Sequence, residues 1–289
     1  MRSLIFPLAG LAMIGAAHAA TCNSGDEIRR YAKGGVAWRN GDVIVYSTPI
    51  LKVDADGAPN SYRVDGKGLS YTCDGVAAIE NGRRLTLDDK DWQPKCRAAW
   101  AAAQATGNYS NVAIFGFAKE AKTNQPIVQK AGDPLPGEAF ITTTAIEISE
   151  APEGTQRRYI DATVIPYIVL PQAFRQANNI KDGAVAAVYR PKTGQLAYAV
   201  FGDTGGSLNE ASVKLHEELG GSPYAKSSGT VRAKNNITDN VLVVLFPDVA
   251  SKPVLDSQKW RDDWIAKGRQ SFEQWGGLDR VKACRQQQK

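Results

Sequence analysis

Short apolar runs rich in β-branched residues recur along most of the chain, a pattern typical of β-strands. Segment 35–53 predicts a strand pair over 36–38 and 43–46, followed by a turn-forming stretch over 53–62. Turn clusters such as Gly132-Asp133-Pro134 separate the later runs. These later strands are expected at 112–117, 140–148, 160–170, 184–189, 196–201 and 241–246.

Three segments have a helical pattern instead. The alanine-rich segment 96–106 ends at Gly107, and segment 207–219, with apolar residues at helical spacing, ends at Gly220-Gly221. Segment 257–275 carries an aromatic stripe and ends at the next glycine pair. Many short strands and few helices predict a mainly β, α+β fold with a β-barrel core.

The first 19 residues have the features of a secretory signal peptide. Met1-Arg2-Ser3 gives a basic start, 4–17 is apolar, and Ala17-His18-Ala19 is a small-x-small cleavage site. The apolar run is short for a membrane span, and no other stretch approaches the required ~20 apolar residues. We therefore expect a secreted or periplasmic single domain over 20–289, with no membrane span.

Composition narrows the class of protein further. Hydrophobic residues make up 43% of the 289 positions and charged residues 22%, which excludes a disordered or low-complexity chain. Loss of Arg2 with the leader lowers the net charge from +5 to +4, and this excess lies in segment 250–289. Because a nucleic-acid binder carries a denser basic footprint, we expect no nucleic-acid partner.

Four cysteines remain after removal of the leader: Cys22, Cys73, Cys96 and Cys284. An even number in an exported chain predicts two disulfides, with three pairings open. Cys22 and Cys284 lie near the two ends, which favours a bridge between them. The absence of C-x-x-C, and the single remaining histidine, argue against a metal site.

Familiar catalytic motifs are missing. No G-x-G-x-x-G, Walker A, H-E-x-x-H or G-x-S-x-G occurs. His216 falls just off the apolar stripe of the helix expected at 207–219, so we interpret it as a solvated side chain. Carboxylates remain, and hydrolysis of a glycosidic bond needs two of them, one as acid and one as base or nucleophile.

The best local candidate follows the strand expected at 196–201. Asp203 lies at its carboxyl end, Gly205-Gly206 allows close approach to the backbone, and Glu210 falls in the first turn of the next expected helix. Structural roles remain open for both carboxyls. Asp203 can be a turn residue, and Ser207-x-x-Glu210 has the pattern of a capping box.

A second acidic cluster comprises Asp54, Asp56, Asp65 and Asp74. Asp54-x-Asp56-Gly57 is similar to the start of a calcium loop, but Ala58 replaces a ligand and an aspartate replaces the final glutamate. An acidic wall that binds sugar, or ordinary turn chemistry, explains the cluster better.

Three ordered blocks resemble the glycoside hydrolase family 75 chitosanases and their bacterial relatives. They are 54–71, 159–171, and the stretch from Gly183 through Gly202-Asp203-Thr204-Gly205 to Glu210-Ala211-Ser212. The resemblance implies inverting hydrolysis of β-1,4-linked glucosamine polymers by Asp203 and Glu210, without a cofactor, by a monomer. The substrate-binding residues that it implies are Asp54, Asp56, Tyr62, Asp161 and Thr204.

The sequence departs from that family in two positions and one spacing. Asn209 replaces a glycine, Gly206 stands where proline is common, and the seven-residue spacing from Asp203 to Glu210 is short. Acid and base roles stay open: Leu208 and Ala211 favour desolvation of Glu210 as the acid, whereas a helix start favours its ionised form.

Two alternative functions remain. Asp203-Thr204-Gly205-Gly206 with the following helix also resembles the end of a double-psi β-barrel, as in membrane-bound lytic transglycosylase A. That resemblance implies a periplasmic enzyme that cleaves peptidoglycan with Asp203 alone. A non-catalytic exported carbohydrate-binding protein is the third hypothesis.

Overall fold

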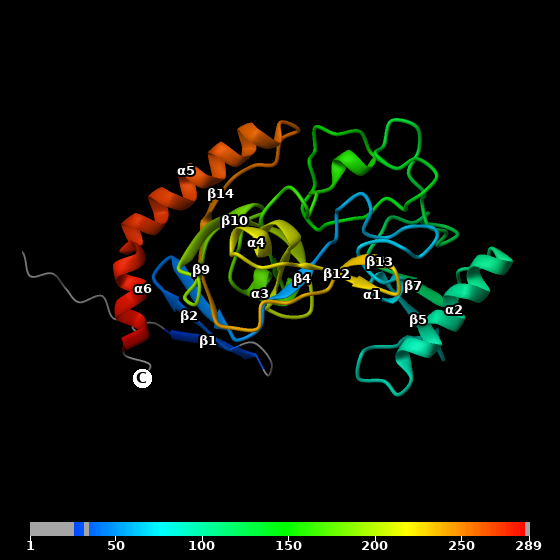
Figure 1. Cartoon of the computed structure of the whole chain (residues 1–289), viewed down its shortest axis with the longest axis horizontal. Helices are drawn as coiled ribbons and strands as arrows, with labels where there is room; N and C mark the ends of the chain where they lie inside the picture. Colours follow the sequence, from blue (N-terminus) through cyan, green and yellow to red (C-terminus); the bar gives the residue numbers. More distant parts are fainter. Residues whose placement is uncertain (1–25, 32–34, 287–289) are drawn as a thin grey trace, which may run out of the picture.

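The computed structural model describes residues 26–31 and 35–286 (Figure 1). The expected signal peptide and Cys22 lie outside this part of the chain. Nine strands form one sheet that curls into a half-barrel, with parallel pairing between β10 and β8 and between β11 and β4. In spatial order the strands are β1 (Asp26–Tyr31), β2 (Gly35–Asn40), β3 (Val43–Thr48), β14 (Val241–Ala250), β9 (Ala184–Arg190), β10 (Gln195–Thr204), β8 (Tyr167–Leu170), β11 (Glu210–Ser212) and β4 (Lys52–Asp54).

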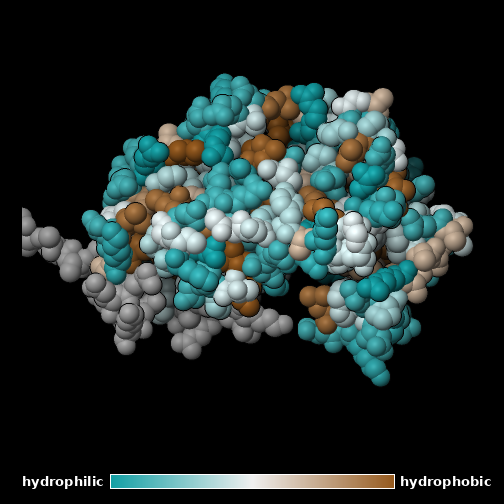
Figure 2. Space-filling model, in the orientation of Figure 1, coloured by the Kyte–Doolittle hydropathy of each residue, from teal (hydrophilic) through white to brown (hydrophobic). Residues whose placement is uncertain are grey.

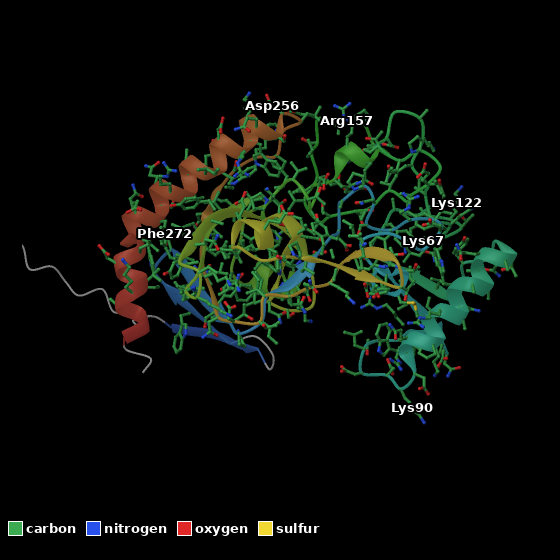
Figure 3. All side chains as sticks on the ribbon, viewed as in Figure 1. Lys67, Lys90, Lys122, Arg157, Asp256 and Phe272 are labelled. Atoms are coloured by element: carbon green, nitrogen blue, oxygen red, sulfur yellow. A yellow bond between two sulfur atoms is a disulfide. The ribbon has the colours of Figure 1, made fainter. Side chains whose placement is uncertain are left out.

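The long helix α5 (Ser257–Trp275) covers part of this sheet, and its predicted bounds are confirmed. The Asp256 carboxylate caps its first turn, accepting from the backbone N–H of Gln258 and Lys259. Phe272 lies near its other end, before Gly276 in the left-handed region (Figure 3). Its aromatic stripe is buried against the sheet, so it closes the large apolar core. Helix α6 (Gly277–Gln286) follows.

A second, smaller core lies beside the half-barrel, in the cyan and green half of Figure 1. It packs α2 (Trp92–Thr106) against β5 (Val76–Glu80), with edge-to-face contacts from Trp100 to Tyr109, Phe117 and Phe140. The remaining elements of the described chain are α1 (Thr72–Gly75), β6 (Arg83–Arg84), β7 (Val112–Ile114), the 3₁₀ turn η1 (Gln156–Arg158), α3 (Gln172–Ala177), α4 (Val213–Glu218), β12 (Tyr224–Ser227) and β13 (Thr230–Ala233).

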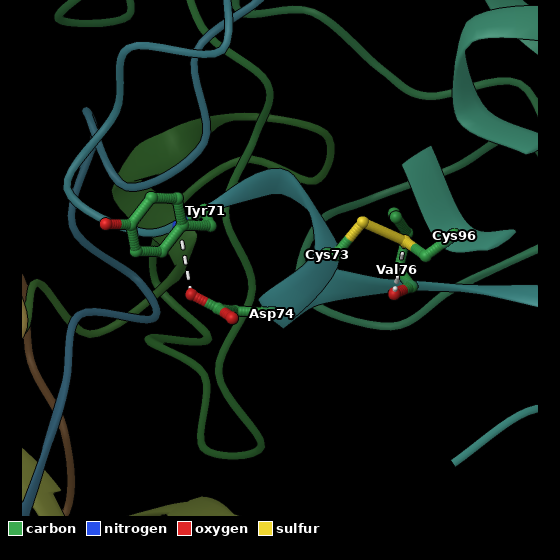
Figure 4. Close-up of a disulfide and its surroundings, with 5 residues drawn as sticks. All are labelled: Tyr71, Cys73, Asp74, Val76 and Cys96. Atoms are coloured by element: carbon green, nitrogen blue, oxygen red, sulfur yellow. Dashed lines mark hydrogen bonds between the residues drawn. A yellow bond between two sulfur atoms is a disulfide. The ribbon is translucent and has the colours of Figure 1, made fainter. Parts of the chain in front are cut away.

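One of the expected disulfides is present in this half. Cys73 at α1 is bonded to Cys96 on α2, beside the hydrogen bond from the Tyr71 N–H to Asp74 (Figure 4). This pairing agrees with the one that the sequence favours. The bridge between Cys22 and Cys284 stays a prediction, because Cys22 lies outside the described residues and the Cys284 side chain is not among those described.

Three strand predictions are wrong in part. Segment 140–148 forms only isolated bridges, because buried glutamine side chains satisfy its backbone: Gln129 donates to the Phe140 carbonyl, and Gln156 bonds both the N–H and the carbonyl of Thr142. In the expected strand 160–170, residues before 167 form a turn closed by the Asp161 carbonyl. The run at 112–117 is likewise shortened to β7.

The helix expected at 207–219 is also shorter than predicted. Residues Glu210–Ser212 form strand β11, and α4 begins after them with Ser212 as its N-cap. The Ser207-x-x-Glu210 capping box is therefore not formed. His216 is fully buried rather than solvated, with its ring nitrogens 3.0 Å from the carbonyl oxygens of Ser212 and Leu51. Burial lowers the pKa of the His216 imidazole. The two contacts of its ring tie α4 to Leu51, the residue before β4.

None of the described helices is both long and apolar enough to cross a membrane. The surface in Figure 2 is mainly hydrophilic, with apolar residues in small groups. A notch in its lower edge separates the half that carries the large sheet from the half that carries the smaller core.

Candidate active site

Asp203 lies near the end of β10, where the pairing with β8 shifts register between Phe201 and Asp203. Its Oδ1 accepts two backbone N–H bonds of 2.7 Å, from Ala145 and from Thr204. The residue is only 7% exposed. Because both donors meet the same oxygen, Oδ2 is the atom available to carry a proton.

A turn at the end of β4 brings two further carboxyls to this place. Asp54 and Asp56 are half-buried, and the Asp54 Oδ1 accepts from the Asp56 N–H at 2.8 Å. The Tyr167 hydroxyl donates to the Asp56 carbonyl oxygen at 2.9 Å and also hydrogen-bonds the Asp54 carboxyl. The interaction with Tyr167 lowers the pKa of Asp54 and so opposes the effect of burial.

Burial and neighbouring carboxyl charges favour the protonated forms of these groups. Burial, with the nearby Glu210 carboxyl, raises the pKa of Asp54 from 3.8 to about 6. Burial and the Asp54 charge raise the pKa of both Asp56 and Asp203 well above 3.8. A raised pKa is what a carboxylic acid needs in order to protonate a leaving oxygen.

Glu210 approaches the same cluster from β11. Its carboxyl lies against the backbone of Gly205, where an added Cβ would come within 2.6 Å of the Glu210 Oε2. The side chain is 25% exposed, and Lys52 Nζ lies 3.6 Å from its Oε1. The Glu210 charge contributes to the raised pKa of Asp54 and of Asp203. A buried acid and a more accessible carboxyl therefore lie within one electrostatic cluster.

Tyr62 reaches the cluster from the smaller core. It is 3% exposed, and its ring lies between Gly75 and Gly116, where an added Cβ would come within 3 Å of the ring at either position. Its hydroxyl hydrogen-bonds the Asp56 carboxyl. Glycines therefore pack against the Tyr62 ring, and its hydroxyl reaches the cluster through Asp56.

The other predicted residues have different places. Thr204 supplies its backbone N–H to Asp203. Asp161 bonds the N–H and hydroxyl of Thr163 within its own turn, and burial raises its pKa. Asp65 closes a turn with the Lys67 N–H and pairs with Arg63, so it does not join the cluster.

Three contributors to the site were not predicted from the sequence. Tyr167 looks like a core residue in an apolar run, and Lys52 and Ala145 join only through the tertiary structure. Asp74 was predicted as part of an acidic wall. Its charge raises the pKa of Asp54 and Asp56 from the side of the smaller core. An aromatic hydroxyl in an otherwise apolar strand was the only signal for Tyr167.

Comparison with known families decides what kind of protein carries this site. The model of the fungal chitosanases of glycosyl hydrolase group 75 matches residues 51–280, about four-fifths of the chain. The chain belongs to this family. The match contains every carboxyl of the cluster, and the resemblance seen in the sequence is confirmed. No curated protein matches the chain significantly. The protein is thus a glycoside hydrolase of the chitosanase type, for which a polysaccharide is the substrate.

Proposed function

We propose that this enzyme cleaves β-1,4 bonds inside chitosan chains by an inverting mechanism that uses Asp203 and Glu210. The observation that carries the proposal is the pairing of a buried carboxyl, whose pKa burial raises, with a more accessible one beside Gly205. Inverting hydrolysis uses such a pair, with one carboxylic acid at the leaving oxygen and one carboxylate at the attacking water.

The surroundings of the two carboxyls support Asp203 as the acid. Burial and the neighbouring carboxyls raise its pKa, and Oδ2 has no backbone donor. Glu210 is more exposed, with 25% of its side chain accessible, which suits a base that must contact the attacking water. This assignment reverses the slight preference for Glu210 as acid that its apolar sequence neighbours give.

Asp54, Asp56 and Asp74 supply negative charge for a polycationic substrate. Protonated glucosamine units near these carboxyls gain an ammonium–carboxylate interaction, which salt weakens. Binding of an ammonium group also favours the ionised form of each carboxyl. We propose that Asp54 and Asp56 bind the substrate directly, and that Tyr62 holds Asp56 in place.

We propose further that residues 20–289 act as one monomeric unit exported to the periplasm or the medium. The site takes residues from both cores of one chain, and the Cys73–Cys96 disulfide suits an oxidising compartment. The parallel β10–β8 and β11–β4 pairs support a double-psi-like form of the half-barrel.

Side-by-side digestion of chitosan and purified peptidoglycan tests this function. We expect glucosamine oligomers from chitosan, released first as the α-anomer, as seen by proton NMR during the first minutes. The Asp203→Asn protein serves as the inactive control. Anhydro-sugar products from peptidoglycan would instead support the transglycosylase hypothesis, and binding without products would support a non-catalytic carbohydrate-binding protein.

A further inference from the structure

A single lysine lies beside the proposed base, and the sheet itself holds it there. Lys52 is on the edge strand β4, directly opposite Glu210 of β11 in a parallel register. Its backbone N–H donates to the Asn209 carbonyl at 2.7 Å. The ammonium lies 3.6 Å from the Glu210 Oε1, and the side chain is 45% exposed. The strand register therefore fixes a positive charge where substrate passes the base.

The charge on the opposite side of the cluster is negative. Asp74 comes from α1, in the half of the molecule that carries the smaller core, whereas Lys52 comes from the half-barrel (Figure 1). Asp74 adds negative charge near Asp54 and Asp56. The site thus has an acidic side at the smaller core and a cation at the sheet edge.

A second cation near this site, Arg232, has its hydrogen bonds with backbone carbonyls outside the cluster. Burial raises the pKa of Asp74, and the Arg232 charge offsets part of that rise. The Arg232 guanidinium, however, donates to the carbonyls of Gly66, Gly68 and Ser70 and stacks over the Tyr71 ring. In the part of the chain that the structure describes, Lys52 is the one basic residue ion-paired to a carboxyl of the cluster. Its ammonium is therefore the positive charge that a sugar unit beside Glu210 meets.

We infer that Lys52 makes the subsite beside Glu210 select an uncharged N-acetylglucosamine unit over a glucosamine unit. The inference rests on the proposed function and adds the acetylation pattern of its substrate. A glucosamine ammonium at this position meets the Lys52 ammonium, and like charges a few ångströms apart repel. The acetamido carbonyl of N-acetylglucosamine instead accepts a hydrogen bond from the lysine, which is a donor only.

Partial digestion of a half-acetylated chitosan tests the inference, with the sugars at both new chain ends identified by mass spectrometry. For the wild-type enzyme we expect one of the two new ends to be enriched in N-acetylglucosamine. Lys52→Gln removes the charge and leaves a polar side chain one atom shorter. It should lower that enrichment about five-fold and raise kcat/KM on fully deacetylated chitosan. Lys52→Arg keeps the charge and should retain the enrichment.

Lys95→Gln is the matched control. Lys95 is paired with Glu80 at 2.8 Å, with side-chain exposures of 40% and 43%, on the outer surface of the smaller core. This variant should leave the end composition unchanged. Glucosamine at both new ends in the wild type, or an unchanged pattern in an active Lys52→Gln protein, would contradict this inference and leave the proposed function intact. An inactive Lys52→Gln beside an active Lys52→Arg would also overturn it, since Lys52 would then serve the reaction itself. If the wild type cleaves no chitosan, the proposed function itself is contradicted.

Discussion

Burial first, and neighbouring carboxyl charges second, raise the pKa of Asp54, Asp56 and Asp203, and this has a consequence for stability. Each pKa lies above the ordinary value of 3.8, that of Asp54 at about 6. The folded protein therefore binds these protons more tightly than the unfolded chain does. Their stabilising contribution is fully present below about pH 4 and is lost as the pH rises through the folded-state values.

Asp54→Asn should therefore change the pH dependence of stability. An amide does not titrate, so the variant lacks the loss of stability that ionisation of Asp54 causes between pH 4 and pH 7. We expect the Tm of the variant to rise relative to the wild type over this range, in thermal unfolding followed by circular dichroism. Parallel Tm curves for the two proteins would show that Asp54 has an ordinary pKa in the folded state.

At the residue scale, the sequence predicts the site through motif resemblance rather than through geometry. Asp203 and Glu210 lie in matching motifs, and Asp54 and Asp56 in another. The same resemblance places Tyr62 against substrate, whereas the structure buries its ring between two glycines. Tyr167 was missed because a tyrosine in a buried strand looks like a core residue. Its hydrogen-bond partner Asp56 lies 111 residues away in the sequence, so no local pattern reveals the contact.

At the element scale, the short strand β11 positions Glu210, and Gly205 makes room for its carboxyl. Gly205→Ala would place a Cβ within 2.6 Å of the Glu210 Oε2 and 2.7 Å of the Val169 Cγ1. We expect kcat to fall at least ~10-fold, because displacement of a positioned base costs most of its effect.

Gly206→Ala is the control for this substitution, since nothing lies within 4 Å of its added Cβ and the residue is exposed. Steady-state rates on chitosan, with Tm measured for both variants, provide the check. Equal rates for the two variants would mean that the Glu210 carboxyl does not rest on Gly205 during the reaction.

The elements differ in how well sequence predicts them. Helix α5 was predicted to the residue, because its aromatic stripe and the glycines that end it are local signals. The three residues of β11 were read as helix, since Ser207-x-x-Glu210 imitates a capping box. Their strand form depends on pairing with Lys52–Asp54, about 160 residues away, which no local pattern reveals.

At the scale of the whole molecule, the site joins two cores, and the Cys73–Cys96 disulfide lies inside the smaller one. The sequence favoured this pairing but did not reveal that two separate cores exist. Replacing both cysteines by alanine should lower the free energy of unfolding by about 2–5 kcal/mol. Because Tyr62 belongs to this core and holds Asp56, we also expect a higher KM for chitosan.

Urea unfolding measures the first effect, and steady-state kinetics the second. Trp100 in the smaller core gives a fluorescence signal near the lost bond, whereas Trp260 and Trp264 are buried in the large core. An unchanged unfolding midpoint, together with an unchanged KM, would mean that the disulfide does not stabilise the smaller core or its hold on Asp56.

The central claim is that two carboxyls, Asp203 and Glu210, carry out the reaction, and kcat of Glu210→Gln on chitosan tests it most directly. We predict a loss of at least ~10²-fold, the low end for a positioned acid or base, with Tm nearly unchanged. Asp203→Asn should be inactive. Glu217→Gln, an exposed glutamate paired with Lys214 on α4, should retain wild-type activity. A Glu210→Gln enzyme that hydrolyses chitosan at close to the wild-type rate would contradict the account and leave Asp203 as the sole catalytic carboxyl.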